Sequence, residues 1–417
     1  MKQFTVAIVV VGSRGGETYA MYQKKFPERM KIVAIAEPRE DHRELAKRLW
    51  DLTDEQCFVD AESFLAQPKM ADVCIIATPD DTHVEIAIKA LDLGYHLLLE
   101  KPISPVKEEV VALRDKVNET GLTVAVCHVL RYTVFYSELR RVLQSGAIGD
   151  VINFQAIEQV GYWHQAHSFV RGNWRTGTPM ILQKCCHDMD ILLFLLGKHC
   201  LRLSSFGHLS HFRADKAPEG AALRCMDGCA AKENCPYDAE KIYISNRATG
   251  IAHGGTYPTE VLVTEPTVER VYEAIKTGPY GRCVYHCDND VVDHQTINME
   301  FEDGLTGVFT MSGLTECPRR QIKLCGTMGQ IDADMDTGLI TVIPHGKESY
   351  TIDVHDLTDD FDGHGGGDHL MMSGLFDAIE GVNRDLKTDI NLSVESHLMA
   401  FAAEESRLNN GKVIEIN

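Results

Sequence analysis

Long apolar runs are missing from this sequence of 417 residues. A membrane-spanning helix needs roughly 18 consecutive apolar residues, and no run approaches that length, so we expect no transmembrane segment. Basic residues are scarce, with 41 Lys and Arg against 61 Asp and Glu and a formal net charge of −20. Because nucleic acids and anionic membranes are bound by basic surfaces, this balance argues against both as partners.

Internal repeats and low-complexity tracts are also absent, and 44% hydrophobic with 24% charged residues is the composition of an ordinary globular protein. At about 100–200 residues per domain, the length corresponds to two or three domains. The apolar segment Thr5–Val11 runs directly into a glycine loop, which predicts a first β-strand rather than a signal peptide. We therefore expect a cytoplasmic protein.

The first 127 residues alternate short apolar runs with amphipathic stretches. The apolar runs lie at 5–11, 31–36, 72–78, 95–99 and 122–127. The stretches between them include Thr82–Leu93 and Pro105–Thr120, each followed by a glycine. Continuous apolar strands separated by helices are typical of a parallel sheet covered on both faces. Residues 1–127 are therefore predicted to form an α/β domain of the doubly wound, Rossmann type.

Residues 128–417 have a different pattern, in which apolar and polar residues alternate over several segments. These predicted strands lie at 151–159, 296–301, 306–311, 320–325, 329–333 and 339–343. One helix is predicted over Met180–Leu196 and another over Ser393–Asn409, which is expected to pack on either domain. The pattern predicts a second, α+β domain with an open, mainly antiparallel sheet. Residues at about 205–290 show neither period and are interpreted as an insertion.

A glycine loop, Gly12-Ser13-Arg14-Gly15, follows the first predicted strand. Glycines at that position let the backbone approach a pyrophosphate, which then lies at the N-terminus of the following helix. The loop matches the second and third glycines of the dinucleotide fingerprint, but Val10 occupies the place of the first. The four residues of the loop are our first candidates for cofactor binding.

Glu37 ends the second predicted strand, 22 residues after Gly15. A carboxylate at this position typically accepts hydrogen bonds from the adenosine ribose. It would repel a 2′-phosphate, so Glu37 favours NAD over NADP, although Arg39 and Arg43 nearby reduce that preference.

Two motifs carry a resemblance to a known family: Thr78-Pro79 followed by His83, and Glu100-Lys101-Pro102. At this spacing they resemble the Gfo/Idh/MocA family, named after glucose–fructose oxidoreductase and inositol dehydrogenase. The likeness runs from Val6 to about Gly149 and resumes at Pro179–Gly197. It implies a Rossmann domain, a C-terminal sheet that forms a homo-oligomer interface, and NAD(P)-dependent oxidation of a sugar or polyol hydroxyl.

The resemblance also implies the roles of individual residues. Lys101 is the expected active-site lysine and His187 the expected active-site histidine. Thr78, Pro79, His83 and Glu100 are expected to line the cofactor site together with Lys101. This set agrees with the chemistry, because removing a hydride from a carbinol requires a base for the hydroxyl proton and a cation near the developing alkoxide.

The substrate-binding candidates come from three segments. The family usually has an aspartate four residues before the histidine, and here Gln183 takes that place, followed by Lys184. Aromatic, histidine and arginine residues are dense over 163–175, a composition suited to sugar recognition or to a structural loop. The candidates are Arg131, Tyr132, Trp163, His167, Arg171, Trp174, Gln183 and Lys184.

Cysteine is abundant, with 13 residues, and one group stands in polar sequence. Cys225, Cys229 and Cys235 are followed by Cys283 and Cys287. Thiolates at short loop spacings are typical of structural Zn²⁺ or of an iron–sulfur cluster. We predict a metal site at Cys225, Cys229, Cys235 and Cys283, with free thiols or a disulfide as alternatives.

The sequence leaves three functions open. The first is an NAD-dependent dehydrogenase of a sugar, polyol or glycoside. The second is a redox glycosidase, in which a transient ketone permits elimination of the aglycone before water adds and the hydride returns. The third is a non-catalytic sensor of NAD or sugar.

Overall fold

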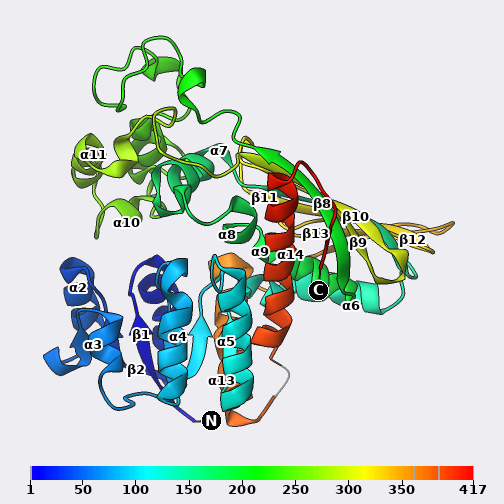
Figure 1. Ribbon diagram of the computed structural model, residues 1–417, viewed down its shortest axis with the longest axis horizontal. Helices are drawn as coiled ribbons and strands as arrows, with labels where there is room; N and C mark the ends of the chain where they lie inside the picture. Colours follow the sequence, from blue (N-terminus) through cyan, green and yellow to red (C-terminus); the bar gives the residue numbers. More distant parts are fainter. Residues whose placement is uncertain (1, 360–361, 384–385, 417) are drawn as a thin grey trace.

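The computed structural model of the protein describes residues 2–359, 362–383 and 386–416. Two β-sheets organise the molecule, one formed by strands between residues 4 and 126 and the other by strands between residues 151 and 415 (Figure 1). Within the described residues, no helix combines the length and the apolar character that a membrane span requires.

The first sheet has six parallel strands in the order β3-β2-β1-β4-β5-β6. They are β1 (Phe4–Val9), β2 (Met30–Ala36), β3 (Cys57–Phe58), β4 (Val73–Ile76), β5 (His96–Leu99) and β6 (Val124–Val126). The connecting helices include α2 (Glu40–Trp50), α3 (Ala61–Leu65), α4 (His83–Asp92) and α5 (Lys107–Thr120). Every residue of β4 is buried, as expected for a strand covered on both faces. The predicted Rossmann-type sheet is confirmed, and its strand order reverses between β1 and β4, where ligands bind in such sheets.

The second sheet has nine strands in the order β14-β13-β12-β11-β7-β10-β9-β8-β15. They are β7 (Val151–Gln159), β8 (Cys200–His208), β9 (His294–Phe301), β10 (Thr306–Ser312), β11 (Arg319–Gly326), β12 (Gly329–Asp334), β13 (Leu339–Pro344), β14 (Tyr350–Asp353) and β15 (Ile414–Glu415). Burial alternates along β7, β9 and β12, which is the period that the sequence showed. Only β7 and β10 pair in parallel, so the prediction of a mainly antiparallel sheet is confirmed.

After β14, the chain returns to the first sheet before its last strand, β15, rejoins the second. Helix α13 (Gly367–Glu380) packs on the first sheet, where Phe376 stacks on Phe4 at 4.9 Å between ring centroids. Helix α14 (Ile390–Leu408) belongs to both cores, because Val394 packs with α5 while Met399 packs beneath the second sheet. In Figure 1, α14 stands between the two sheets. The predicted C-terminal helix is confirmed, and it joins the two parts of the molecule.

The prediction of a single helix over Met180–Leu196 is wrong in one respect, because the structure forms two helices there. Helix α8 (Met180–Gln183) ends before Lys184, and α9 (Cys186–Leu196) begins after Cys185. All the residues of α8 and most of those of α9 are buried, so the apolar pattern continues across the break. The break frees the main-chain carbonyl of Gln183 from the helix, and its partner is described below.

The insertion lies between β8 and β9 and has a core of its own. Buried aromatic residues such as Phe212, Tyr237 and Tyr243 form that core. Its helices include α10 (Thr259–Leu262) and α11 (Val268–Thr277). In Figure 1, α10 and α11 lie above the first sheet, on the side of α2.

Candidate functional site

The glycine loop after β1 is tightly packed at one end and open at the other. Val10 has φ 70°, a conformation that β-branched residues rarely adopt and that glycine takes easily. A Cβ on Gly15 would lie 2.0 Å from the carbonyl oxygen of Val10, whereas one on Gly12 would meet no atom closer than 4.0 Å. There is therefore open space beside the backbone at Gly12, and Val10 adopts the conformation that a glycine would take at the first position of the fingerprint.

The third loop residue, Arg14, connects the glycine loop to two other segments. Its Nε donates to Oε1 of Glu100 at 2.7 Å and its Nη2 donates to Oδ1 of Asp368 at 2.8 Å. The Tyr19 hydroxyl also donates to Glu100. Burial opposes ionisation of Glu100, but Arg14 and Lys101 outweigh it and lower the pKa of that carboxyl. The segment that starts at Ser13 is thus fixed to the end of β5.

Glu37 lies at the end of β2 with its carboxylate turned towards the glycine loop. It is 2% exposed. Its Oε2 accepts from the Val11 backbone N–H at 2.9 Å and its Oε1 from that of Arg39 at 2.8 Å. The structure therefore places Glu37 beside the loop, where it was expected to meet the ribose.

The loops after β4 and β5 are linked by His83. Its ring nitrogens lie 2.8 Å from the carbonyl oxygens of Pro102 and of Thr78, and the ring is 1% exposed. Pro79 separates β4 from the turn that begins α4. His83 thus positions the cofactor candidates Thr78 and Pro79 against the segment that carries Lys101.

Lys101 is held by the residue at the helix break. Its Nζ donates to the main-chain oxygen of Gln183 at 2.8 Å and to Oε1 of the same residue at 3.1 Å. The Gln183 amide in turn donates through Nε2 to Oδ2 of Asp80 at 3.1 Å, and Thr178 donates to the same oxygen at 2.7 Å. The lysine from the first sheet and the glutamine beneath the second therefore meet in one hydrogen-bond chain.

His187 lies on the first turn of α9, one helical turn beyond Gln183. Its Nδ1 is buried and has no hydrogen-bond partner, which leaves Nε2 as the nitrogen that a substrate can reach. Burial, together with Lys101 and His128 nearby, lowers the pKa of His187 well below its usual range. A neutral imidazole at this position can accept a proton.

Lys184 lies at the break itself and belongs to a second group of charges. Its Nζ is 3.2 Å from Oε1 of Glu158, and Arg320 is 2.9 Å from Oε2 of Glu158 and 2.8 Å from Oδ1 of Asp188. Burial raises the pKa of Glu158 although Arg320 and Lys184 oppose it. This balanced cluster lies beside His187 on the side of the second sheet.

The aromatic and histidine-rich candidates divide by exposure. Trp174 is 38% exposed, and Trp163 stacks on His164 at 5.4 Å between ring centroids. His167 is buried, with its Nδ1 3.0 Å from the Tyr243 hydroxyl, and burial followed by Arg171 lowers its pKa to about 3. Of the four candidates Trp163, His167, Arg171 and Trp174, the two tryptophans are the ones that keep surface with which to contact a sugar.

Arg131 and Tyr132 lie after β6 and are buried. Arg131 donates through Nε and Nη2 to the carboxylate of Asp190, each at 2.7 Å, and through Nη1 to the Lys387 carbonyl at 3.0 Å. The Tyr132 hydroxyl is 3.4 Å from Thr388. In this structure the donors of Arg131 bind α9 and the segment before α14.

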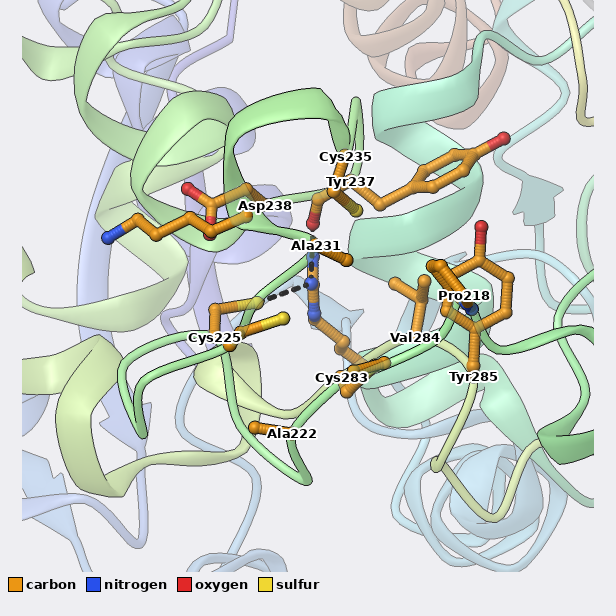
Figure 2. Close-up of a pocket in the computed structure, with 14 residues that line it drawn as sticks. Pro218, Ala222, Cys225, Ala231, Cys235, Tyr237, Asp238, Cys283, Val284 and Tyr285 are labelled. Carbon is orange, nitrogen blue, oxygen red and sulfur yellow. Dashed lines mark hydrogen bonds between the residues drawn. The ribbon is translucent and has the colours of Figure 1, made fainter.

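The structure corrects the prediction of a metal site. Cys225, Cys229, Cys235 and Cys283 do line one cavity, of about 20 Å³ (Figure 2). Within the described residues, however, no three Cys, His, Asp or Glu side chains are arranged to hold a metal ion. The prediction of zinc or an iron–sulfur cluster is therefore not supported, and all the cysteines are free thiols.

The physical reason is the side chain of Arg171, which was predicted to bind substrate. Its guanidinium lines the same cavity and donates through Nη2 to Sγ of Cys225 at 3.5 Å and to the Tyr237 carbonyl at 2.6 Å. Its Nε donates to the Arg282 carbonyl at 2.7 Å. A buried cation beside the thiols disfavours a second one, and Arg171 fixes the aromatic segment to the insertion instead.

Three site residues were not among the candidates. Asp80 directly follows Pro79, and its role depends on Gln183, which is distant in sequence. His128 follows β6 and lies beside His187. Asp368 binds Arg14 and His364, at 2.8 Å and 3.0 Å. The only sequence signal was the glycine-rich turn around His364 and Asp368.

Two family models match this chain. The model described as "Oxidoreductase family, NAD-binding Rossmann fold" matches residues 6–128, and that of the "GFO/IDH/MocA C-terminal domain" matches residues 136–232. The chain is 20% identical to the YteT protein of Bacillus subtilis, over 90% of this chain and 84% of that protein. It is 28% identical to scyllo-inositol 2-dehydrogenase (NAD(+)) of the same organism, over 43% of this chain and 50% of the dehydrogenase. The latter match thus spans half of that relative.

Solved structures share the whole architecture. An inositol dehydrogenase homologue from Azotobacter vinelandii, complexed with NADH and myo-inositol, aligns with a TM-score of 0.70 and 14% identity over 99% of this chain and 98% of its own. An oxidoreductase domain protein from Kribbella flavida aligns with a TM-score of 0.72 and 16% identity over all of both chains. At these identities the likeness establishes the fold.

Proposed function

This chain belongs to the Gfo/Idh/MocA family of NAD-binding oxidoreductases, and from that premise we propose that it oxidises a secondary hydroxyl group of a sugar, polyol or glycoside. The observation that carries the proposal is the meeting of Lys101 with Gln183, at 2.8 and 3.1 Å, one helical turn before His187. This brings a cation and a neutral imidazole together at the carboxyl ends of β4 and β5, as the reaction requires.

The cofactor we propose is NAD, which when bound accepts the hydride from the carbinol carbon. The open backbone at Gly12 fits a pyrophosphate, and Glu37 beside the loop fits a ribose with two free hydroxyl groups. A 2′-phosphate would meet the buried carboxylate of Glu37, so NAD is favoured over NADP. Glu100 holds the backbone N–H of Lys101 at 2.9 Å and so fixes the lysine at the inner end of this site.

In the proposed mechanism, Lys101 and His187 act on the substrate oxygen. The Nζ of Lys101 donates a hydrogen bond to that oxygen and stabilises the developing alkoxide. The Nε2 of His187 accepts the hydroxyl proton. Gln183 is neutral, so it orients the lysine without adding a carboxylate to the site.

The substrate class follows from the residues around this centre and from the relatives. The charges of Lys184 and Arg320 are balanced by Glu158 and Asp188, so this cluster does not offer an acidic substrate an unpaired cation. The tryptophans offer ring faces to the C–H groups of a sugar. The relatives named above include a dehydrogenase of scyllo-inositol, and a neutral cyclic polyol or glycoside is the class that we propose.

The test is a screen of inositols, neutral sugars and aryl glycosides with NAD and with NADP. It follows NADH formation and aglycone release in the same samples. NADH without aglycone release is expected. Aglycone release without net NADH would instead assign the redox glycosidase, and NAD binding with neither reaction would assign a sensor.

The matched variants are Lys101→Ala and Lys101→Arg. Removing one donor to a developing oxyanion costs about 10²–10³-fold in kcat, so Lys101→Ala is expected to lose at least about a hundredfold in kcat while binding of NAD, measured by calorimetry, is retained. Lys101→Arg keeps the charge but cannot release a proton, and it separates the electrostatic role from proton transfer. A Lys101→Ala variant with unchanged kcat would contradict the proposed mechanism.

A further inference from the structure

A second histidine lies directly behind His187. His128 follows β6, is 0% exposed, and presents its ring to that of His187 at 5.9 Å between centroids and 67° between planes. The proposed reaction uses the side of His187 that faces the substrate. The side that faces His128 has no assigned role.

The neighbours of His128 determine where its proton lies. Its Nδ1 is 3.0 Å from Oδ1 of Asp190 and 3.2 Å from the Ser393 hydroxyl. Although burial opposes it, Arg131 and then His128 hold the pKa of Asp190 at about 2, so this carboxylate is ionised and only accepts hydrogen bonds. The Nδ1–H of His128 therefore points to Asp190, so in the neutral ring the lone pair is on Nε2.

The neighbouring ring of His187 also has an unpaired nitrogen. Nε2 of His128 and Nδ1 of His187 are both buried and both lack a hydrogen-bond partner. Buried polar atoms are nearly always paired in folded proteins. Nε2 of His128 can accept a hydrogen bond, and Nδ1 of His187 can carry the proton for that bond.

The other polar groups around the two rings are already committed. His397, 5.5 Å from His128, accepts from the Ile103 N–H through Nε2 and contacts the Ser393 carbonyl through Nδ1, both at 2.9 Å. His364, 6.4 Å from His187, has its Nδ1 3.0 Å from Asp368. The cations around the two rings are also paired: Arg131 binds Asp190, Lys101 binds Gln183, and Arg320 binds Glu158 and Asp188.

We infer that His128, oriented by Asp190, is a positioning residue that sets the tautomer of His187. Since neither nitrogen has a partner within hydrogen-bond distance, the Nδ1–H of His187 donates to Nε2 of His128 through one water molecule, and Nε2 of His187 is left unprotonated towards the substrate. This inference deepens the proposed function and rests on it for its role in the reaction. The tautomer itself is a property of the protein without substrate.

The arrangement has a consequence for the proton step. When Nε2 of His187 takes the hydroxyl proton, the O–H bond breaks, an N–H bond forms and the ring becomes a cation. Burial and Lys101 disfavour that cation, and so does His128 when its own ring is charged. When the His128 ring is neutral, with the Asp190 carboxylate behind it, its lone pair instead accepts from the other nitrogen of His187 and offsets part of that cost. This is the way in which a buried carboxylate orients and supports a catalytic imidazole.

The first experiment is nitrogen NMR of the full-length protein labelled with ¹⁵N-histidine, with the His187 signals assigned from their loss in His187→Gln. In the unaltered protein we expect His187 to be protonated at Nδ1 and bare at Nε2. In His128→Phe, which preserves a ring without nitrogen atoms, we expect that preference to be lost. An unchanged tautomer in His128→Phe would overturn the inference, whether or not any substrate has been found.

The second experiment measures the pH dependence of kcat/KM with the best substrate of the screen. In His128→Phe the His187 cation loses its acceptor. We therefore expect kcat to fall by about tenfold or more, with KM changed little. We also expect the acidic limb of the pH profile of kcat/KM to move to lower pH. An unchanged limb would contradict the inference. The matched control is His397→Gln, which removes an equally buried imidazole whose two partners at 2.9 Å are backbone groups. It controls for lost stability and is expected to leave both the tautomer and the limb unchanged.

Discussion

The identity of one side chain, Gln183, is explained by its two neighbours. Its amide accepts from Lys101 at 3.1 Å and donates to Asp80 at 3.1 Å. A carboxylate at this position would accept from Lys101 equally well, but it would lie against the Asp80 carboxylate, and like charges at that distance disfavour ionisation. Glutamine at position 183 departs from the family pattern, and its amide can donate a hydrogen bond to Asp80 where a carboxylate could not.

This explanation predicts that the pair can be exchanged. Gln183→Glu places two carboxylates together and adds negative charge beside Lys101, so we expect kcat/KM to fall by about tenfold, equivalent to ~1.4 kcal/mol. Asp80→Asn in that background restores a donor opposite the new carboxylate, and we expect it to recover most of the loss. The measurement is kcat/KM and melting temperature for the two single variants and the double variant. A double variant no better than Gln183→Glu would contradict the pairing.

Among the elements, the short helix α10 links the insertion to the nucleotide site. The carboxyl of Glu260 on α10 interacts with that of Glu17, which lies in the segment Ser13–Tyr19 after the glycine loop. Burial and Glu17 raise the pKa of Glu260 to about 7 from its usual 4.5. A shared proton thus joins the insertion to the segment that carries Arg14.

The pH dependence follows from the sign of that shift. The folded protein binds a proton at Glu260 that the unfolded chain releases above about pH 4.5, so this contribution to stability is fully present below that pH and is lost as pH rises through about 7. Glu260→Gln keeps the donor at every pH. We expect it to melt like the unaltered protein near pH 5 and at a higher temperature above about pH 8.

The control for this prediction is Glu265→Gln on the same insertion. Glu265 is exposed and lies 3.8 Å from Arg48, an ion pair of the kind that contributes little. We expect no gain in melting temperature from this variant at high pH. Equal gains from both variants would show that the effect is one of net charge and not of the Glu17–Glu260 pair.

For the whole molecule, the open face of the second sheet is the feature that concerns assembly. One row of residues crosses four strands on that face, with Phe206 55% and Ile157 39% exposed. The row is Phe206 on β8, Thr296 on β9, Thr310 on β10 and Ile157 on β7. Exposed apolar residues on a flat sheet are typical of an interface, and they agree with the homo-oligomer that the family resemblance implies.

We therefore expect the protein to be an oligomer in solution and Ile157→Lys to dissociate it. A lysine in the middle of the row would bury an unpaired charge in the interface. The measurement is molar mass by light scattering across a range of protein concentrations. Val59→Lys, at a residue 54% exposed directly after β3 of the first sheet, is the control and is expected to leave the mass unchanged. An unaltered protein that is already monomeric would contradict the proposal.

Much of this architecture could be predicted because it depends on local patterns. The continuous apolar runs of β1 and β4 predicted a buried parallel sheet, and the alternating run of β7 predicted a half-exposed strand with the correct bounds. Lys101 and Glu37 could also be found, since residues at the carboxyl ends of parallel strands meet at one edge. The break at Lys184 could not, because the residues on both sides of it are buried and carry no change of pattern.

The sequence by itself determined the fold, the family and the residues that follow the strands of the first sheet, since each is encoded by neighbours along the chain. Only the tertiary structure decided which side chains face one another. It placed the Gln183 carbonyl against Lys101, Asp80 against the Gln183 amide, and His128 behind His187. It also placed Arg171 among the cysteines whose spacing had indicated a metal. These contacts join residues far apart in sequence, and spacing alone carries no information about them.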